Sequence, residues 1–418
     1  GVWLAPARRR RWVGWAALAA WAALWLSDLL ALIITGSRGA WAGLVVAALV
    51  AGVWMLRPWA MQRWRAAGLV VDLGLITAAV VVIVIWLLLL MQPTPSTLSM
   101  GGRVALWRAG LALIGDAPFT GVGLRGTMMA LSTYVYILHV GFISHVHNLY
   151  LELAAEQGLI GLFAWGFLVI SAWAALVQAR RRQVLPMTMQ ATVAAALTAL
   201  LLHGVVDAGL YASRLAPLLF LPIGVAWAAG GREHGNDLEG RSRRLLGALA
   251  PLAVVAILFA WPGSRAAWQA NLGAVAQTRA ELFLYTWPAW PIQDALRRSP
   301  VIDLAPAIAR YQAALALDPA NVTANRRLGQ IALSRGDRAQ ARLWLEAAYT
   351  RQPDHPATRL LLGEVYALDG EPEQAVALWR TLDLSMGQLD GRRWWIGETG
   401  TPADVAAFDA ALALLRGE

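Results

Sequence analysis

The amino-acid sequence predicts an all-α protein in which a polytopic bundle of transmembrane helices is followed by a soluble domain of helical repeats. Of its 418 residues, 58% are hydrophobic and only 15% are charged, whereas a soluble protein has about 25% charged residues. The hydrophobic residues are gathered in runs of about 20, the length that a helix needs to cross a bilayer. The C-terminal part has no such run and contains an internal repeat, which predicts the second domain.

Seven apolar runs predict the membrane helices. They cover residues 13–36, 40–56, 67–90, 149–177, 188–206, 215–230 and 245–261. Arginine clusters lie at 8–11, 57–65, 180–182 and 232–244, and the positive-inside rule places such clusters in the cytoplasm. The expected location is therefore the cytoplasmic (inner) membrane. The connections at 37–39, 92–147 and 207–214, and everything after residue 261, are expected on its outer, periplasmic or extracellular side.

Charge and cysteine content exclude several other classes of protein. The net charge is +9, and every basic residue is an arginine. The arginines lie in short runs between apolar segments, as membrane topology requires, so we expect contacts with membrane lipids and not with nucleic acid. The sequence has no cysteine, which excludes disulfides, thiolate zinc sites and a cysteine nucleophile.

The C-terminal repeat has a period of 34 residues. Its equivalent positions are Pro319 and Pro353, Leu328 and Leu362, Gly329 and Gly363, Gly336 and Gly370, and Ala341 and Ala375. This period and pattern resemble tetratricopeptide repeats, which stack to bury a shared core and expose a concave binding face. The domain could therefore be a structural tail or a receptor for a protein partner.

Three parts are expected along the chain. Residues 1–262 would form the membrane domain, with a large outward loop at 92–147. Residues 263–302 would form a linker with partial helix, and residues 303–418 the repeat domain.

The most unusual stretch precedes the fourth apolar run. It contains His145, His147, Asn148 and Glu152, and Glu156 follows one helical turn later. Ionisable groups at the mouth of a membrane helix are costly to keep there, so their presence suggests a functional site.

The spacing after these histidines carries a family resemblance. His147 and Asn148 are followed after nine residues by Gly158, and after two more by Gly161 and Leu162. This H-N-x9-G-x-x-G-L pattern resembles the signature of the O-antigen ligase and polymerase superfamily. Further segments that resemble the family, in the family's order, are 37–39, 103–107 and 118–123. Because the family has more membrane helices than this chain, the chain is expected to be its C-terminal part.

The resemblance implies a reaction. The family transfers a glycan from a polyprenyl-pyrophosphate carrier to an acceptor hydroxyl on the outer side of the membrane, with inversion and without a metal or other cofactor. The acceptor could be a lipid, a growing polysaccharide or a protein. An O-antigen ligase, a polysaccharide polymerase and a protein O-oligosaccharyltransferase therefore all stay open.

Roles for single residues follow from the resemblance. Arg38 and Arg103 are expected to hold the pyrophosphate, because a guanidinium binds phosphate oxygens bidentately and keeps its charge. His147 is the expected general base, since the reference pKa of histidine, about 6.5, suits proton transfer near neutral pH. Substrate contacts are expected from Arg108, Arg125, His145, Asn148, Glu152 and Arg214.

Other roles stay open for these and neighbouring side chains. Arg38 could anchor a helix end at the membrane interface. Glu152 and Glu156 could hold Arg103 or Arg125 in place or act as a general base themselves. A metal site could be formed by His139, His145 and His147. The acceptor could be contacted by His203, Asp207, Tyr211 and Arg214.

Two other classes of function compete with the transferase. A membrane-anchored scaffold would use the repeats to recruit partners, and its histidines would be incidental. A transporter would depend on Asp28, a carboxylate inside the first apolar run, where an ionisable group is expensive.

Overall fold

The computed structural model describes residues 5–63, 100–136, 138–140, 143–211, 213–230, 261–286, 289, 291–382 and 384–417. Within these ranges the ordered elements are helices, and the strand-like pairing is limited to an isolated bridge between His139 and Ile292. The predicted all-α class is confirmed. The apolar run at 67–90, nearly all of the run at 245–261 and the arginine cluster at 232–244 lie outside the described residues.

Two compact units make up the chain. One contains residues 1–93 and 179–203, and the other contains residues 94–178 and 204–418. The expected domain limits at residues 262 and 302 do not coincide with this division. The reason is that the connection after residue 93 packs with the repeat region within a single unit.

The first unit contains α1 (Ala5–Thr35), α2 (Arg38–Arg63) and α7 (Met187–Gly204). Helices α2 and α7 approach closely: a Cβ on Gly43 would lie 3.6 Å from the carbonyl oxygen of Ala199. The indole N–H of Trp54 also donates a hydrogen bond of 3.2 Å to Oε1 of Gln190. Small residues and polar pairs of this kind are how membrane helices commonly associate.

Among the described residues, three helical segments are long and apolar enough to cross a membrane: Arg38–Trp59, Leu149–Arg182 and Met187–Gly204. Shorter apolar segments are Ala22–Thr35 and Ala216–Gly230. On α6 (Leu149–Arg182), Phe163 and Phe167 are 72% and 70% exposed. Large apolar side chains presented outward in this way suit lipid rather than water, so the chain is a membrane protein.

The second unit contains the described part of the connection at 92–147, which forms two helices where a loop was expected. It forms α4 (Met100–Asp116) and α5 (Thr127–Tyr134). Helix α4 buries Leu106, Ala109, Leu113 and Ile114, and this spacing of three and four residues is that of a helix with one apolar face.

Gly158 interrupts α6 with φ of 68°. At this break the backbone N–H of Leu159 donates 2.7 Å to the carbonyl oxygen of Pro118. A Cβ on Gly158 would lie only 2.0 Å from the carbonyl oxygen of Phe119, so a side chain there would collide with the backbone. A Cβ on Gly121, which has φ of 64°, would lie 2.4 Å from the carbonyl oxygen of Ala155. The two glycine-containing motifs of the sequence therefore contact each other directly.

Two short elements complete the membrane part of this unit. They are η1 (Ala216–Leu219) and α8 (Leu221–Gly230). Both pack on α6: the rings of Trp165 and Phe220 lie 5.6 Å apart edge to face, and a Cβ on Gly230 would meet Ala175 at 2.7 Å.

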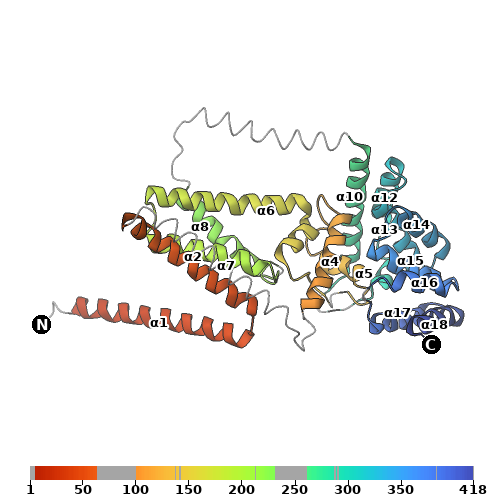
Figure 1. The fold of residues 1–418 in the computed structure, drawn as a ribbon, viewed down its shortest axis with the longest axis horizontal. Coiled ribbons are helices and arrows are strands. Elements are labelled where there is room, and N and C mark those ends of the chain that lie inside the picture. Colours follow the sequence, from red (N-terminus) through yellow and green to blue (C-terminus); the bar gives the residue numbers. More distant parts are fainter. Residues whose placement is uncertain are drawn as a thin grey trace. The chain divides into compact units, whose positions relative to one another are not determined.

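In the repeat region, here the described residues of 262–417, the helices run from α10 to α18 (Figure 1). They are α10 (Pro262–Leu282), α11 (Gln293–Arg298), α12 (Ala305–Leu317), α13 (Val322–Ser334), α14 (Arg338–Arg351), α15 (Pro356–Leu368), α16 (Pro372–Trp379), α17 (Met386–Thr399) and α18 (Pro402–Arg416). The segment expected to be a linker is thus mostly helical. Helix α10 packs along α12, where Gly273 leaves room for the ring of Tyr311.

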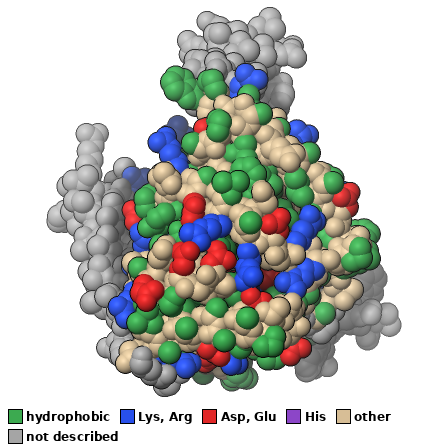
Figure 2. All heavy atoms as spheres, turned by 90° about the vertical axis from the view of Figure 1, so that its right-hand side faces the viewer, with side chains coloured by type: hydrophobic (Ala, Val, Ile, Leu, Met, Phe, Trp, Pro, Cys, Tyr) green, Lys and Arg blue, Asp and Glu red, His purple; other side chains and the backbone are tan. Residues whose placement is uncertain are grey.

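The positions that define the repeat have structural roles. Gly329 packs against Leu345, and Gly363 packs against the indole of Trp379, in both cases too closely for a side chain. Gly336 and Gly370 have φ of 84° and 79° directly after α13 and α15, the left-handed conformation with which many helices end. Figure 2 shows basic and acidic side chains interspersed over the outer face of this region, as in a solvated surface.

Candidate active site

The candidate site is assembled around the short turn that follows α7. The side-chain amide of Asn148 donates 2.8 Å to the carbonyl oxygen of Val205, and a guanidinium nitrogen of Arg103 donates 3.3 Å to that of Val206. Asn148 also accepts hydrogen bonds from the backbone N–H groups of Tyr150 and Leu151, which caps the start of α6. Three segments far apart in the sequence therefore meet at residues 205–207.

His145, His147 and Asp207 form the centre of the site. Nδ1 of His147 and Nε2 of His145 each lie 3.4 Å from Oδ1 of Asp207, and the two imidazole rings are 4.2 Å apart. Burial alone would raise the pKa of Asp207, but hydrogen bonds from both histidines outweigh burial and hold that pKa well below its usual range. The carboxylate is therefore charged and faces two imidazoles.

The backbone of His147 is in the left-handed region, with φ of 52°. Such a conformation costs of order 1–3 kcal/mol and is kept where the surroundings enforce it, often at functional sites. Here the indole N–H of Trp107 lies 3.4 Å from the carbonyl oxygen of His147. The neighbouring Val146 is fully buried and packs 3.1 Å from where a Cβ of Gly110 would be.

Two glutamates near the start of α6, Glu152 and Glu156, hold neighbouring segments through hydrogen bonds. Oε2 of Glu152, which is 1% exposed, accepts 2.9 Å from the backbone N–H of Val146. One turn later, Glu156 accepts from the hydroxyl of Tyr211, which also accepts from Gln157. Both carboxylates therefore accept hydrogen bonds from within the protein, one from the residues before α6 and the other from the residues after α7.

Two segments of the chain match known protein families. Residues 21–166 match the family described as O-Antigen ligase, and residues 332–395 match the family described as Tetratricopeptide repeat. Residues 21–166 are therefore similar to the O-antigen ligase family. Searches of curated proteins and of solved structures gave no match. The family match supports a function in membrane glycan transfer.

The predicted site residues do not all lie together in the structure. It brings together Arg103, His145, His147, Asn148 and Glu152, with Asn148 and Glu152 using their polar atoms inside the protein. The side chains outside this cluster are exposed: Arg108 on α4, Arg125 with φ of 61°, and Arg214 after the turn. Arg38 begins α2 in the other compact unit.

Asp207 is the residue whose role sequence reasoning assigned differently, as a contact for the acceptor. It lies outside the residues that match the ligase family, so the motif could not point to it. The available signal was its position: a carboxylate directly after a predicted membrane run, on the side expected to carry His147.

The same three side chains could hold a divalent cation. One ligand atom from each of His145, His147 and Asp207 lies within 4.8 Å of the others, and two nitrogens with one oxygen are a known donor set for zinc. His139 does not join them, because it pairs with Ile292 elsewhere. Chemically, the cluster can act as a metal-binding group or as a carboxylate-oriented base.

Proposed function

We propose that this protein is a membrane glycosyltransferase. It moves a glycan from a polyprenyl-pyrophosphate carrier to an acceptor hydroxyl on the outer face of the cytoplasmic membrane. The observation that carries this proposal is the pairing of Asp207 with His147, which lies inside the segment that matches the ligase family.

His147 is the proposed general base. A charged carboxylate only accepts hydrogen bonds, so Asp207 fixes the imidazole tautomer that has its proton on Nδ1. The basic lone pair is then on Nε2, at the other side of the ring. In the reaction the acceptor oxygen attacks the anomeric carbon and its proton passes to Nε2. The bond from that carbon to the pyrophosphate oxygen breaks, and the leaving group takes the electron pair.

Arg103 is the proposed partner of the leaving group. It lies in the first turn of α4, and one of its terminal nitrogens is engaged by the Val206 carbonyl oxygen. Among the residues that the structure describes, its buried Nε has no hydrogen-bond partner, which is costly for a charged group unless a ligand completes it. A pyrophosphate oxygen would do so, and the guanidinium would stabilise the charge that develops there. Arg38 is proposed as a second such group.

No metal is required in this proposal, because Asp207 already compensates the charge that His147 gains on accepting a proton. The chemistry is the same for a ligase, a polysaccharide polymerase and a protein O-oligosaccharyltransferase. A membrane-anchored scaffold is the alternative outside this class. It differs in requiring the repeats but not His147.

The decisive experiment is glycan transfer by the full-length protein in membranes supplied with lipid-linked donor. His147→Ala and Arg103→Ala should abolish transfer and let the donor accumulate, at unchanged protein level. Arg351→Ala, an exposed arginine of the repeat region, is the control and should behave as wild type. Full transfer by His147→Ala would remove the histidine from the mechanism, and dependence on the repeats alone would favour the scaffold.

A further inference from the structure

Two helices of the repeat region, α13 and α15, bury most of their residues. Ten of the 13 residues of α13 and nine of the 13 of α15 are buried, against three of the 14 of α14. One face of α13 and α15 is covered by the other repeat helices. The opposite face, here called the inner face, is covered by the 92–147 connection of the same chain. Repeat arrays commonly use such a face to bind a partner.

Asp116, at the end of α4, is held by this inner face. It is 5% exposed and forms an ion pair with Arg326 of α13. Nε2 of His355 lies 3.2 Å from it, and the hydroxyl of Thr323 donates 3.0 Å to its other oxygen. The hydroxyl of Tyr134 on α5 also donates to Asp116. Three of its four partners thus come from the repeats.

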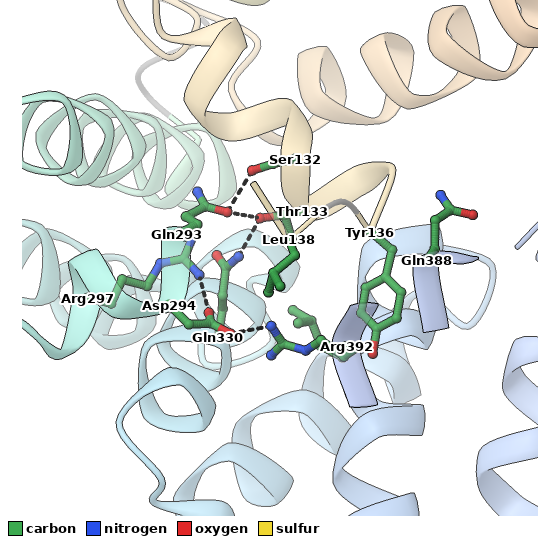
Figure 3. A pocket seen from close by; sticks show the side chains of 11 residues that line it. Ser132, Thr133, Tyr136, Leu138, Gln293, Asp294, Arg297, Gln330, Gln388 and Arg392 are labelled. Carbon is green, nitrogen blue, oxygen red and sulfur yellow. Dashed lines mark hydrogen bonds and ion pairs between the residues drawn. The ribbon is translucent and has the colours of Figure 1, made fainter. Parts of the chain in front are cut away.

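A second buried cluster binds Tyr136, which follows α5; Figure 3 shows Tyr136 with two members of the cluster, Arg392 and Asp294. Arg392 binds Glu364 through two hydrogen bonds of 2.7 Å and forms an ion pair with Asp294. The hydroxyl of Tyr136, from the connection, donates 2.9 Å to the same Glu364. The aromatic ring of Tyr136 packs in the core formed by α15 to α18.

A third set of contacts fills the space between these clusters (Figure 3). Gln293 of α11 accepts from the hydroxyls of Ser132 and Thr133 on α5, at 2.8 and 3.1 Å. The cavity between Gln293, Gln330 and Arg392 has a volume of about 30 Å³, which is room for water and not for a peptide. The inner face is therefore already occupied.

Helix α4 connects this docking to the candidate active site. Its last residue is Asp116, and its first turn carries Arg103. Between them, Trp107 contacts the carbonyl oxygen of His147, and Gly110 packs on Val146. A hydrogen-bonded helix is stiff along its axis, so fixing one end restrains the other.

We propose that the repeat region is a positioning domain whose partner is the 92–147 connection of its own chain. Through α4 it fixes the backbone around His147 and the guanidinium of Arg103. Separating the two parts would break the buried ion pair of Asp116 with Arg326 and would take the hydroxyl of Tyr136 away from Glu364, and breaking up a buried ion pair is strongly unfavourable. The docking is therefore permanent. The consequence for catalysis rests on the proposed function, whereas the docking does not.

The test uses full-length protein in lipid nanodiscs and two variants. Asp116→Asn removes the charge that the repeats hold, and Tyr134→Phe removes only one hydroxyl from the same cluster. Arg393→Gln is the control, since it breaks an exposed ion pair with Asp409 inside the repeat region. Hydrogen exchange is followed peptide by peptide, and transfer kinetics are measured in parallel.

Asp116→Asn should accelerate exchange in α5 and in residues 143–148 at least tenfold, and Tyr134→Phe should do so to a smaller extent. The kcat of transfer should fall at least fivefold in Asp116→Asn, with the donor KM within twofold. Arg393→Gln should leave both unchanged. If Asp116→Asn unfolds the repeats, the milder Tyr134→Phe decides.

Wild-type exchange at residues 143–148 in Tyr134→Phe and in a folded Asp116→Asn would overturn the proposal. Accelerated exchange with unchanged kcat would overturn the positioning role. A wild-type protein that transfers no glycan, combined with accelerated exchange in the variants, would instead leave the docking intact and contradict the proposed function.

Discussion

Nδ1 of His147 lies 3.4 Å from Oδ1 of Asp207, although the two residues precede α6 and follow α7. The histidine belongs to the segment that matches the ligase family, and the carboxylate does not. The fold therefore adds to the family motif a partner that the motif does not contain.

Replacing Asp207 by Asn should impair catalysis more than binding. The amide keeps the size of the side chain but cannot balance the charge of a protonated imidazole. We expect kcat to fall by about 10²-fold, within the range for general acid–base catalysis, with little change in donor KM. Asp354→Asn, at a 93% exposed carboxylate, serves as the control. Unchanged kcat in Asp207→Asn would show that His147 needs no orienting carboxylate.

Gly158→Ala should destabilise the protein, because the new Cβ would collide with the backbone of Phe119 at a position with φ of 68°. We expect a loss on the order of 3 kcal/mol from strain and overpacking together. Gly166→Ala in the same helix meets no atom within 4 Å and should be neutral or slightly stabilising. Thermal unfolding of both variants in detergent measures the difference, and equal midpoints would contradict the reported contact.

Stability of the second unit should depend on acid pH through Asp294. Burial would raise the pKa of this residue, but Arg392 and Arg297 outweigh burial and lower it to about 2. A lowered pKa in the folded state adds stability that is fully present above the unfolded value of about 3.9. That stability is lost as the pH falls toward 2.

The measurement is a series of unfolding temperatures from about pH 5 to about pH 2. Wild type should lose stability steeply below about pH 4. Asp294→Asn should be less stable at neutral pH and show a shallower decline. A decline in this variant as steep as in wild type would assign the acid sensitivity to other carboxylates, with Asp116 as the first to examine.

Removing divalent cations should leave transfer unchanged. The proposal gives Asp207 the role of compensating His147, so EDTA treatment of membranes should not reduce the rate. Loss of activity on chelation, with recovery on adding zinc, would indicate that His145, His147 and Asp207 hold a metal. Direct metal analysis of purified wild type and His145→Ala distinguishes a bound ion from an indirect effect.

Much of the fold could be predicted because it depends on local patterns. Apolar runs marked the membrane helices, and the 34-residue period marked the repeats that match the tetratricopeptide family. Helix α4 was missed although its signal was present, since Leu106, Ala109 and Leu113 recur with helical spacing. The glycines and prolines around it directed the interpretation toward a loop.

Contacts between distant segments could not be predicted in the same way. Asp116 and Arg326 form an ion pair although they lie far apart in the sequence, and each looks like an ordinary charged residue in its own helix. Likewise nothing local in Gly158 shows that it faces Phe119 rather than another helix. The roles assigned to Arg38, Arg103 and His147 stay predictions until the variants are measured.

The break at Gly158 also determines how deep the site lies. It separates the polar start of α6 from a mostly apolar stretch, residues 159–179, which ends before the arginines of the last turn. At about 1.5 Å per residue this stretch is about 32 Å long, which matches the hydrocarbon layer of about 30 Å. The bilayer can thus be crossed without submerging the histidines. They would stand at the height of the lipid phosphates, where a carrier anchored by its polyprenyl chain presents its pyrophosphate without leaving the membrane.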